Sequence, residues 1–343
     1  MLQFKKTFFG TLAMAASIVS AASPGAAQSN FFQGKTITIL AAGTAGGGID
    51  LAARTIARHL SRHVPGQPHV IAQVMPGAGG IRALDFLSSA APQDGTHIVI
   101  VPPGPMLEPL IGARQTSYRI IDFPALGAIS KETSMCAAWH ASQFHTVDDA
   151  RKMQMSVGGT GAGSSTDIYP VVMNEVLGTK FKVITGFLGS QEVSLAIERG
   201  EVDGRCGWGW TSIKTTKLDW ARDKKLRFLM QFGLTKNAEH PDVPLAIDLA
   251  EKPEDKQILR LLFAPLMLND PVFAAPRTPP ERVAQLRAAF SAMVADQTFR
   301  ADVLQGQGSE PNATSGEEAQ KLLEEVYRTP EPVVARLKKI LNP

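Results

Sequence analysis

Several patterns that usually indicate a function are missing from this chain of 343 residues. It has two cysteines, Cys136 and Cys206, which are too few for a disulfide scaffold; the sequence leaves open whether they pair or remain buried thiols. It has no block of Lys and Arg, and its 35 basic residues nearly balance its 32 acidic ones. Because nucleic acid is held through many phosphate contacts, this balance argues against a nucleic-acid partner.

Catalytic motifs are missing as well. The chain shows no Gly-x-Ser-x-Gly elbow, and its glycine loops have neither the Gly-Lys-Ser/Thr ending of a P-loop nor the G-x-G-x-x-G spacing. His59 and His63, four residues apart, could be a metal pair; with no further ligand nearby, we interpret them as part of a solvated helix face. We therefore expect no enzyme, no metal and no cofactor. An exported enzyme acting on carboxylates is the weaker alternative.

One long apolar stretch is present, at the N-terminus. Lys5 and Lys6 precede an uncharged segment, 7–27, which ends in small residues ahead of Gln28. This order is typical of a secretory signal peptide, and the apolar part is shorter than the roughly 20 residues of a spanning helix. We predict that residues 1–27 are a signal peptide and that the mature protein is exported.

The remaining chain alternates strands with helices. Strands are predicted at 36–40, 70–74, 97–101, 153–157, 182–184 and 226–231, and helices at 49–64, 81–90, 167–177, 193–199, 280–294 and 317–341, the last one broken at 329–332. Strand–loop–helix units of this kind indicate an α/β fold with parallel sheets, in which ligands bind at the carboxyl ends of the strands. The length exceeds what one core usually serves, so we predict two lobes.

Three glycine loops, 43–48, 76–80 and 158–165, each connect a strand to a helix. Glycine lets the backbone approach a ligand, and the following helix directs unpaired N–H groups into the same space, so such a loop favours an anion. Asp50, in the first turn after the first loop, suits the positive end of its helix. Tight turns without a ligand are the alternative, but three such loops in one chain favour a binding site.

At this point a family resemblance is clear. The chain resembles the Bug-type solute receptors of the tripartite tricarboxylate transporter family in Gly46-Gly47-Gly48-Ile49-Asp50-Leu51-Ala52-Ala53-Arg54, Pro76-Gly77-Ala78-Gly79-Gly80, Pro92-Gln93-Asp94-Gly95-Thr96, Gly200-Glu201-Val202-Asp203 and Pro241-Asp242-Val243-Pro244. The resemblance implies a type II periplasmic-binding-protein fold, two α/β lobes with a ligand cleft between them. We expect lobe 1 at 28–128 and 246–343, and lobe 2 at 129–245.

The resemblance also implies a function and a site. It implies a periplasmic receptor, monomeric, that binds a small carboxylate (a di- or tricarboxylate, an amino acid or an aromatic acid) and delivers it to an integral membrane permease; a sensor is the alternative partner. The ligand residues carried over are Thr44, Ala45, Gly46, Gly47, Gly77, Ala78, Gly79, Thr160, Gly161, Ala162, Gly163, Ser164, Ser165 and Asp203.

One segment departs from the family pattern. Where the family usually shows Pro-Tyr-Lys/Arg-Gly, this chain has the apolar Gly186-Phe187-Leu188-Gly189, so we expect a ligand whose far end is less charged or aromatic. Trp208 and Trp210 could stack on a ring, although packing within the second lobe is the preferred interpretation. Arg82 and Arg205 could each pair with a carboxylate but are left outside the predicted site as solvated or structural residues.

Overall fold

The computed structural model describes residues 1–2, 31–43, 45–46, 48–112, 116–161, 164–187 and 190–341. The predicted signal peptide therefore lies outside the described residues, apart from its first two. No helix within these ranges is long and apolar enough to cross a bilayer.

The first sheet contains most of the N-terminal strands. Its members are β1 (Thr36–Ala41), β2 (His69–Val74), β3 (His97–Ile100), β4 (Ala125–Ser130), β10 (Asn269–Ala274) and β11 (Thr314–Ser315). They lie in the order β11-β4-β10-β3-β1-β2. β1 pairs in parallel with β2 and β3, whereas β10 runs antiparallel between β3 and β4.

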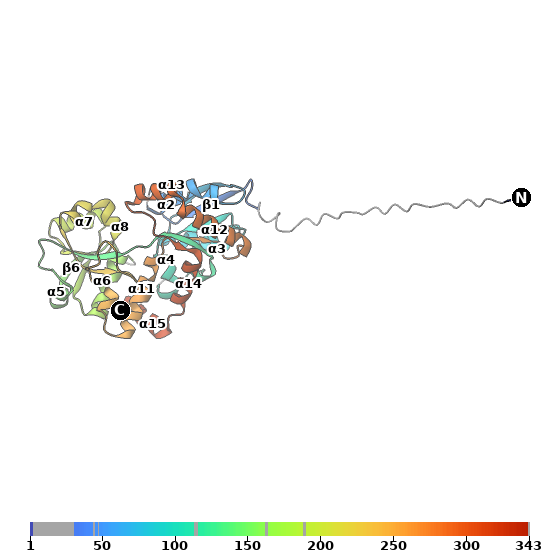
Figure 1. Ribbon diagram of the computed structural model, residues 1–343. Coiled ribbons are helices and arrows are strands. Elements are labelled where there is room, and N and C mark those ends of the chain that lie inside the picture. The colour runs from blue at the N-terminus through green and yellow to red at the C-terminus, as the bar shows by residue number, and fades with distance from the viewer. Residues whose placement is uncertain are drawn as a thin grey trace.

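The second sheet repeats this arrangement. Its strands are β5 (Ser134–Trp139), β6 (Met155–Gly158), β7 (Phe181–Ile184), β8 (Gly204–Gly209) and β9 (Leu226–Phe232), in the order β7-β6-β8-β5-β9. Here β5 is the antiparallel strand, and it lies between β8 and β9. In each sheet the strand that arrives from the other sheet, β10 or β5, runs antiparallel to both of its neighbours. The short β11 also runs antiparallel to β4. The two-lobe α/β fold is thereby confirmed (Figure 1).

Helices cover both faces of each sheet (Figure 1). Their bounds are α2 (Gly48–Leu60), α3 (Ile81–Ser89), α4 (Gly104–Ile111), α5 (Val147–Lys152), α6 (Ser165–Leu177), α7 (Ser190–Glu198), α8 (Trp210–Thr216), α9 (Leu218–Arg222), α10 (Ala246–Leu249), α11 (Pro253–Phe263), α12 (Pro280–Ala295), α13 (Gln297–Gln307), α14 (Gly316–Tyr327) and α15 (Glu331–Leu341). α2, α12 and α13 pack on one face of the first sheet, and α3 and α14 on the other. α7, α8 and α9 cover one face of the second sheet, and α6 covers the opposite face.

The C-terminal helices contribute to both lobes. Ile258 of α11 and Val334 of α15 belong to the same buried cluster as Val157 and Cys206 of the second sheet. The predicted assignment of 246–343 to lobe 1 alone leaves out this packing. β4 runs on to Ser130, which pairs with Asn269 of β10, so the predicted boundary at 128/129 falls inside a strand of the first sheet. We propose that the lobes divide within 131–133 and near 245/246, and that α11 and α15 lie against the second sheet.

The chain crosses between the sheets twice. Residues 131–133 connect β4 to β5, and the return from β9 to β10 passes through α10 and α11. The two crossings touch, because the Glu132 N–H donates to the Leu266 carbonyl over 2.7 Å.

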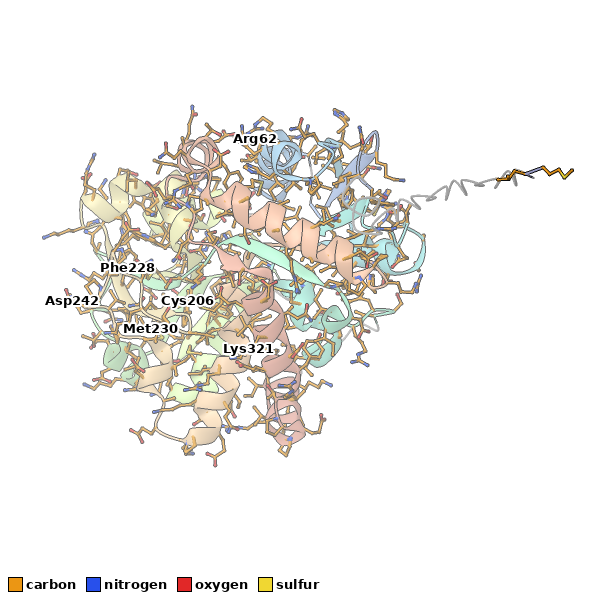
Figure 2. All side chains as sticks on the ribbon, turned by 45° about the vertical axis from the view of Figure 1, so that its right-hand side comes forward. Arg62, Cys206, Phe228, Met230, Asp242 and Lys321 are labelled. Carbon is orange, nitrogen blue, oxygen red and sulfur yellow. A yellow bond between two sulfur atoms is a disulfide. The ribbon has the colours of Figure 1, made fainter. Side chains whose placement is uncertain are left out.

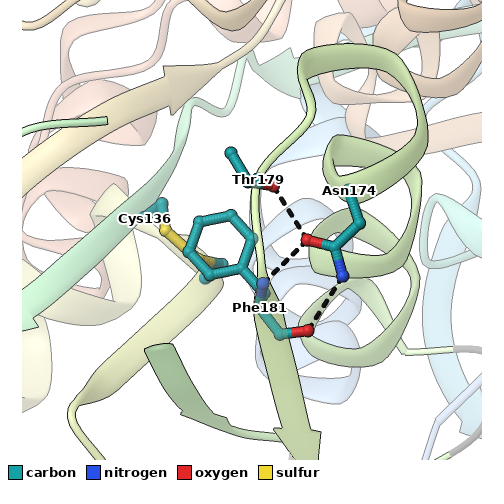
Figure 3. The surroundings of a disulfide bond; sticks show 5 residues. Cys136, Asn174, Thr179 and Phe181 are labelled. Carbon is teal, nitrogen blue, oxygen red and sulfur yellow. Dashed lines mark hydrogen bonds between the residues drawn. A yellow bond between two sulfur atoms is a disulfide. The ribbon is translucent and has the colours of Figure 1, made fainter. Parts of the chain in front are cut away.

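Cys136 and Cys206 form a disulfide that joins β5 to β8, so the pairing left open by the sequence is settled. Both residues are fully buried, and Cys206 lies within the lobe of the second sheet (Figure 2). Beside them the Asn174 side chain fixes the start of β7, accepting from the Phe181 N–H and the Thr179 hydroxyl and donating to the Phe181 carbonyl, each over 2.8 Å (Figure 3).

The interpretation of His59 as a solvated residue is wrong. Its side chain is buried, its Nε2 lies 2.8 Å from Asp302 Oδ2, and its ring meets Phe299 edge to face. α13 covers this face of α2, which the helical period of α2 alone could not reveal. No cluster of three His, Cys, Asp or Glu residues suited to a metal occurs within the described ranges.

Candidate ligand site at the carboxyl edges of the two sheets

The loops that follow β1, β2 and β3 meet at the carboxyl edge of the first sheet. The Met75 N–H after β2 donates to the Ala41 carbonyl over 2.8 Å. Gly80 has no room for a side chain, since a Cβ there would lie 3.1 to 3.3 Å from Pro105, Pro102 and Ala42. The first two glycine loops are therefore brought together, as expected for parallel strands.

In the first glycine loop Thr44 and Gly47 lie outside the described residues, whereas Ala45 and Gly46 are exposed. The Gly46 N–H donates to Asp50 Oδ2 over 2.8 Å, and Asp50 Oδ1 pairs with Arg54 at 2.9 Å. The hydrogen bond from Gly46, together with the Arg54 cation, lowers the pKa of Asp50 below its usual 3.8. The chain's own carboxylate thus occupies the Gly46 amide that the sequence predicts for the ligand.

The second glycine loop is open. The amides of Gly77 and Ala78 donate to no residue in the described part of the chain, and the contacts of Gly79 lie outside that part. Ala78 is exposed and has a φ of 48°, while Gly77 and Gly80 have φ values of 140° and 108°. A left-handed alanine costs roughly 1–2 kcal/mol, and such strain is concentrated at functional sites. The amides of Gly77 and Ala78 are the best candidates for holding an anion.

Arg82 borders this loop. Its side chain is exposed, its stem packs over Gly77, and its Nη1 donates weakly to the Pro76 carbonyl over 3.4 Å. A solvated cation therefore lies beside the open amides without covering them.

The third glycine loop lies at the carboxyl edge of the second sheet, and Ala162 and Gly163 are outside its described residues. Asp167 Oδ2 accepts from the Gly161 N–H at 3.0 Å and from the Ser164 hydroxyl at 2.8 Å. The Thr160 N–H and hydroxyl both lie 3.0 Å from Thr166 Oγ1, and the Ser165 hydroxyl donates to the Gly207 carbonyl. The polar groups predicted for the ligand are thus largely engaged within the chain.

Asp203 lies away from this edge. Its Oδ2 accepts from the Ser156 N–H at 2.8 Å and from the Ser156 hydroxyl at 2.6 Å, which ties β8 to β6. This carboxylate has a structural role in the sheet, and its contact with a ligand stays a prediction.

The two tryptophans of β8 and α8 are packed. Trp208 and Trp210 are buried in one hydrophobic cluster with Ile213 and Trp220, which confirms the packing interpretation. Arg205, which the sequence sets aside, is buried beside them with its guanidinium 5.0 Å from the Trp208 ring centre. A charged residue two places beyond a recognisable Gly-Glu-Val-Asp motif is the only sequence signal for it.

No hydrogen bond within the described residues joins the loops of the first sheet to the third glycine loop. Two surface hollows lie elsewhere. One of about 460 Å³ is lined by Ser88, Ser89, Ser117, Tyr118, Arg119, Asp122, Phe123, Pro276 and Arg277. The other, of about 570 Å³, lies between α11 and α14. Neither contains a predicted ligand residue.

Known proteins share parts of this sequence and this architecture. Among curated proteins, a Cupriavidus necator protein described as "UPF0065 protein in gbd 5'region" is 35% identical over 94 residues, a stretch that covers 27% of this chain and 28% of that protein.

Among solved structures, a ligand-free TctC solute binding protein from Polaromonas is 20% identical, with a TM-score of 0.69 over 90% of this chain and 98% of that one. Rhodopseudomonas palustris MatC with bound malate is 20% identical, with a TM-score of 0.60 over 90% and 99% of the two chains. Another R. palustris protein, with adipate, is 19% identical, with a TM-score of 0.60 over 89% and 96%. At these identities the likeness establishes the fold.

The family follows from the sequence match. A model described as "Tripartite tricarboxylate transporter family receptor" matches residues 52–338, which include the second and third glycine loops, β8 and most of the C-terminal helices. The chain therefore belongs to the receptor family of the tripartite tricarboxylate transporters, whose members are solute-binding proteins and not enzymes.

Proposed function

We propose that this protein is a periplasmic receptor that captures a small carboxylate between its lobes and delivers it to an integral membrane permease. The observation that carries the proposal is the second glycine loop, where two consecutive amides, Gly77 and Ala78, have no acceptor within the described chain. A carboxylate oxygen is an acceptor that such amides can share, and it needs no side-chain charge.

The flanking loops support this assignment. Asp50 and Asp167 hold the first and third glycine loops in place, so the ordered backbone leaves the second loop free for the ligand. Binding across the two lobes would close them about the two crossings, as hinge closure does in other two-lobe receptors.

A thermal-shift screen tests the ligand class. The probes are malate, adipate, citrate, aspartate and benzoate, with glucose and lysine as non-acidic controls; the first two acids are those bound by the related structures. A ligand at 100 times its Kd adds about 2.7 kcal/mol of stability, which gives a clear rise in Tm. Stabilisation by glucose or lysine alone would contradict the carboxylate proposal.

The partner and the compartment have separate tests. We expect the mature chain to begin near Gln28 in the periplasmic fraction, to elute as a monomer, and to co-purify with a membrane permease only when the acid is present. N-terminal sequencing, light scattering and affinity capture measure these three outcomes. Ligand-dependent capture of a histidine kinase in place of a permease would favour the sensor alternative.

A further inference from the structure

Arg205 lies at the carboxyl edge of the second sheet. β8 runs parallel to β6, with Gly204 level with Val157, and β6 ends one residue later. Arg205 is therefore level with the end of β6, next to the loops expected to face the ligand. Its Nη2 donates to the Ser190 hydroxyl at 3.0 Å, which places the guanidinium at the start of α7.

The guanidinium is buried without an acid. Arg205 is only 6% exposed, and no carboxylate of the described chain forms an ion pair with it. Within the described residues, its Nε and Nη1 have no hydrogen-bond partner, and neither has the nearby Trp208 Nε1. Three buried donors in one place thus lack an acceptor in this part of the chain, although buried polar groups are almost always paired.

The helix beside Arg205, α7, adds to this excess of hydrogen-bond donors and positive charge. The first amides of a helix have no intrahelical acceptor and carry a partial positive charge, so anions are stabilised there and cations are not. The first turn of α7 contains one carboxylate, Glu192, and the buried arginine at the same end adds a full positive charge. Burial lowers the pKa of Arg205 to about 10, so the side chain is still cationic at neutral pH.

We propose that Arg205, Ser190 and the first turn of α7 form a second anion subsite, which takes a carboxylate at the end of the ligand away from the second glycine loop. This inference rests on the proposed function. It replaces the expectation of a less charged or aromatic far end, because the charge comes from β8 and not from the apolar segment at 186–187. The ligand class is then an acid with two carboxylates at its opposite ends.

Matched ligands test the subsite in the unaltered protein. Each straight-chain diacid from succinate to suberate is compared with its monomethyl ester by calorimetry at neutral pH. We expect the best diacid to bind about 10- to 100-fold more tightly than its half-ester, the range of a charge-assisted hydrogen bond to a buried partner. Equal binding of acid and half-ester would overturn the subsite while leaving the receptor function intact.

Variants assign the preference to Arg205. In Arg205→Met, which keeps the length of the side chain over Trp208, we expect the diacid and its half-ester to bind within about threefold of each other. Arg205→Lys should retain part of the preference. Arg199→Met, at the exposed far end of α7, is the matched control and should bind as the unaltered protein does.

The outcomes separate the two proposals. Loss of diacid preference in Arg205→Met with an unchanged or higher Tm in the absence of ligand supports the subsite, since a buried charge without a partner is costly. The subsite is rejected if the diacid preference persists in Arg205→Met. It is also rejected if this variant has a lower Tm while its folded fraction keeps the same preference, because Arg205 then only supports the fold. Binding of no acid by the unaltered protein removes the proposed function as well.

Discussion

Apart from β11, the two sheets have equivalent strand orders, yet their carboxyl edges are built differently. The first edge presents unpaired backbone amides in the second glycine loop, with Arg82 exposed at the rim. At the second edge Asp167 accepts from the Gly161 amide, and the arginine, Arg205, is buried with its Nε and Nη1 unpartnered within the described residues. Arg82 and Arg205 look alike in the sequence, but water screens one charge and not the other.

The difference between the two edges corresponds to a difference between general and selective recognition of the ligand. Backbone amides can donate to any carboxylate, whatever the rest of the ligand is. A buried cation is favourable only when an anion of the right reach compensates its lost hydration, so it discriminates between ligands. One lobe would thus recognise the shared acid group and the other the particular ligand.

The largest effect should come from Ala78→Val. A β-branched residue is poorly tolerated at a φ of 48°, so the loop must change and the amides of Gly77 and Ala78 lose their alignment. We expect carboxylate binding to fall about 100-fold, close to 2.7 kcal/mol, as measured by calorimetry with the acid that the screen selects.

Ala78→Gly is the control for this change. It removes the strain and keeps the amides, so binding should persist and the free energy of unfolding should rise by about 0.5–1 kcal/mol. Unchanged binding in both variants would place the anion elsewhere than on the second glycine loop.

Asp167→Ala tests whether the third glycine loop is held by its own carboxylate. The Gly161 amide and the Ser164 hydroxyl lose their acceptor, and we expect unfolding to become easier by about 2 kcal/mol in urea titrations. Asp167→Asn, which keeps one acceptor oxygen, should lose less than half of this. A cost below about 0.5 kcal/mol for both would show that the loop needs no internal carboxylate.

Asp50→Asn tests the same idea in the first glycine loop, through pH. Because the folded pKa of Asp50 is below 3.8, its ionised form stabilises the protein above that pH, and this contribution is lost as pH falls through the folded pKa. The variant should cost about 1 kcal/mol at pH 7 and show a flatter acid limb of unfolding free energy between about pH 5 and 3. Parallel acid limbs in the two proteins would argue against the Gly46–Asp50 bond.

Arg82→Gln should have the smallest effect. An exposed cation contributes little and is screened by salt, so the Kd should rise by less than about threefold at low salt and be unchanged at high salt. A tenfold loss that persists at high salt would mean that Arg82 contacts the ligand directly, and the contrast with Arg205 would fail.

Much of the fold could be predicted from the sequence because its N-terminal units are regular. The period of α2 and the apolar run of β1 are strong signals, and the break of the last helix at 329–332 separates α14 from α15. β4, β5 and β8 were not predicted because almost every residue in them is buried, so neither face alternates with a polar one. Their pairing depends on segments that are distant in the sequence.

The candidate site could be predicted only in part. Glycine and serine residues mark the loops, and this signal is local. Which amides remain free depends on whether a carboxylate four or six residues onward turns back to them, as Asp50 and Asp167 do. The burial of Arg205 depends on α7 and Trp208 together, which no single segment reveals.

The position of β10 has a consequence for the order in which the chain can fold. β10 lies between β3 and β4 in the first sheet, although about 140 residues of sequence, including the whole second sheet, separate β4 from it. A chain that emerges from its N-terminus leaves β3 and β4 without a common neighbour until Asn269–Ala274 is released. The second sheet, complete at Phe232, can therefore assemble first, and closing the first sheet is a late, long-range step.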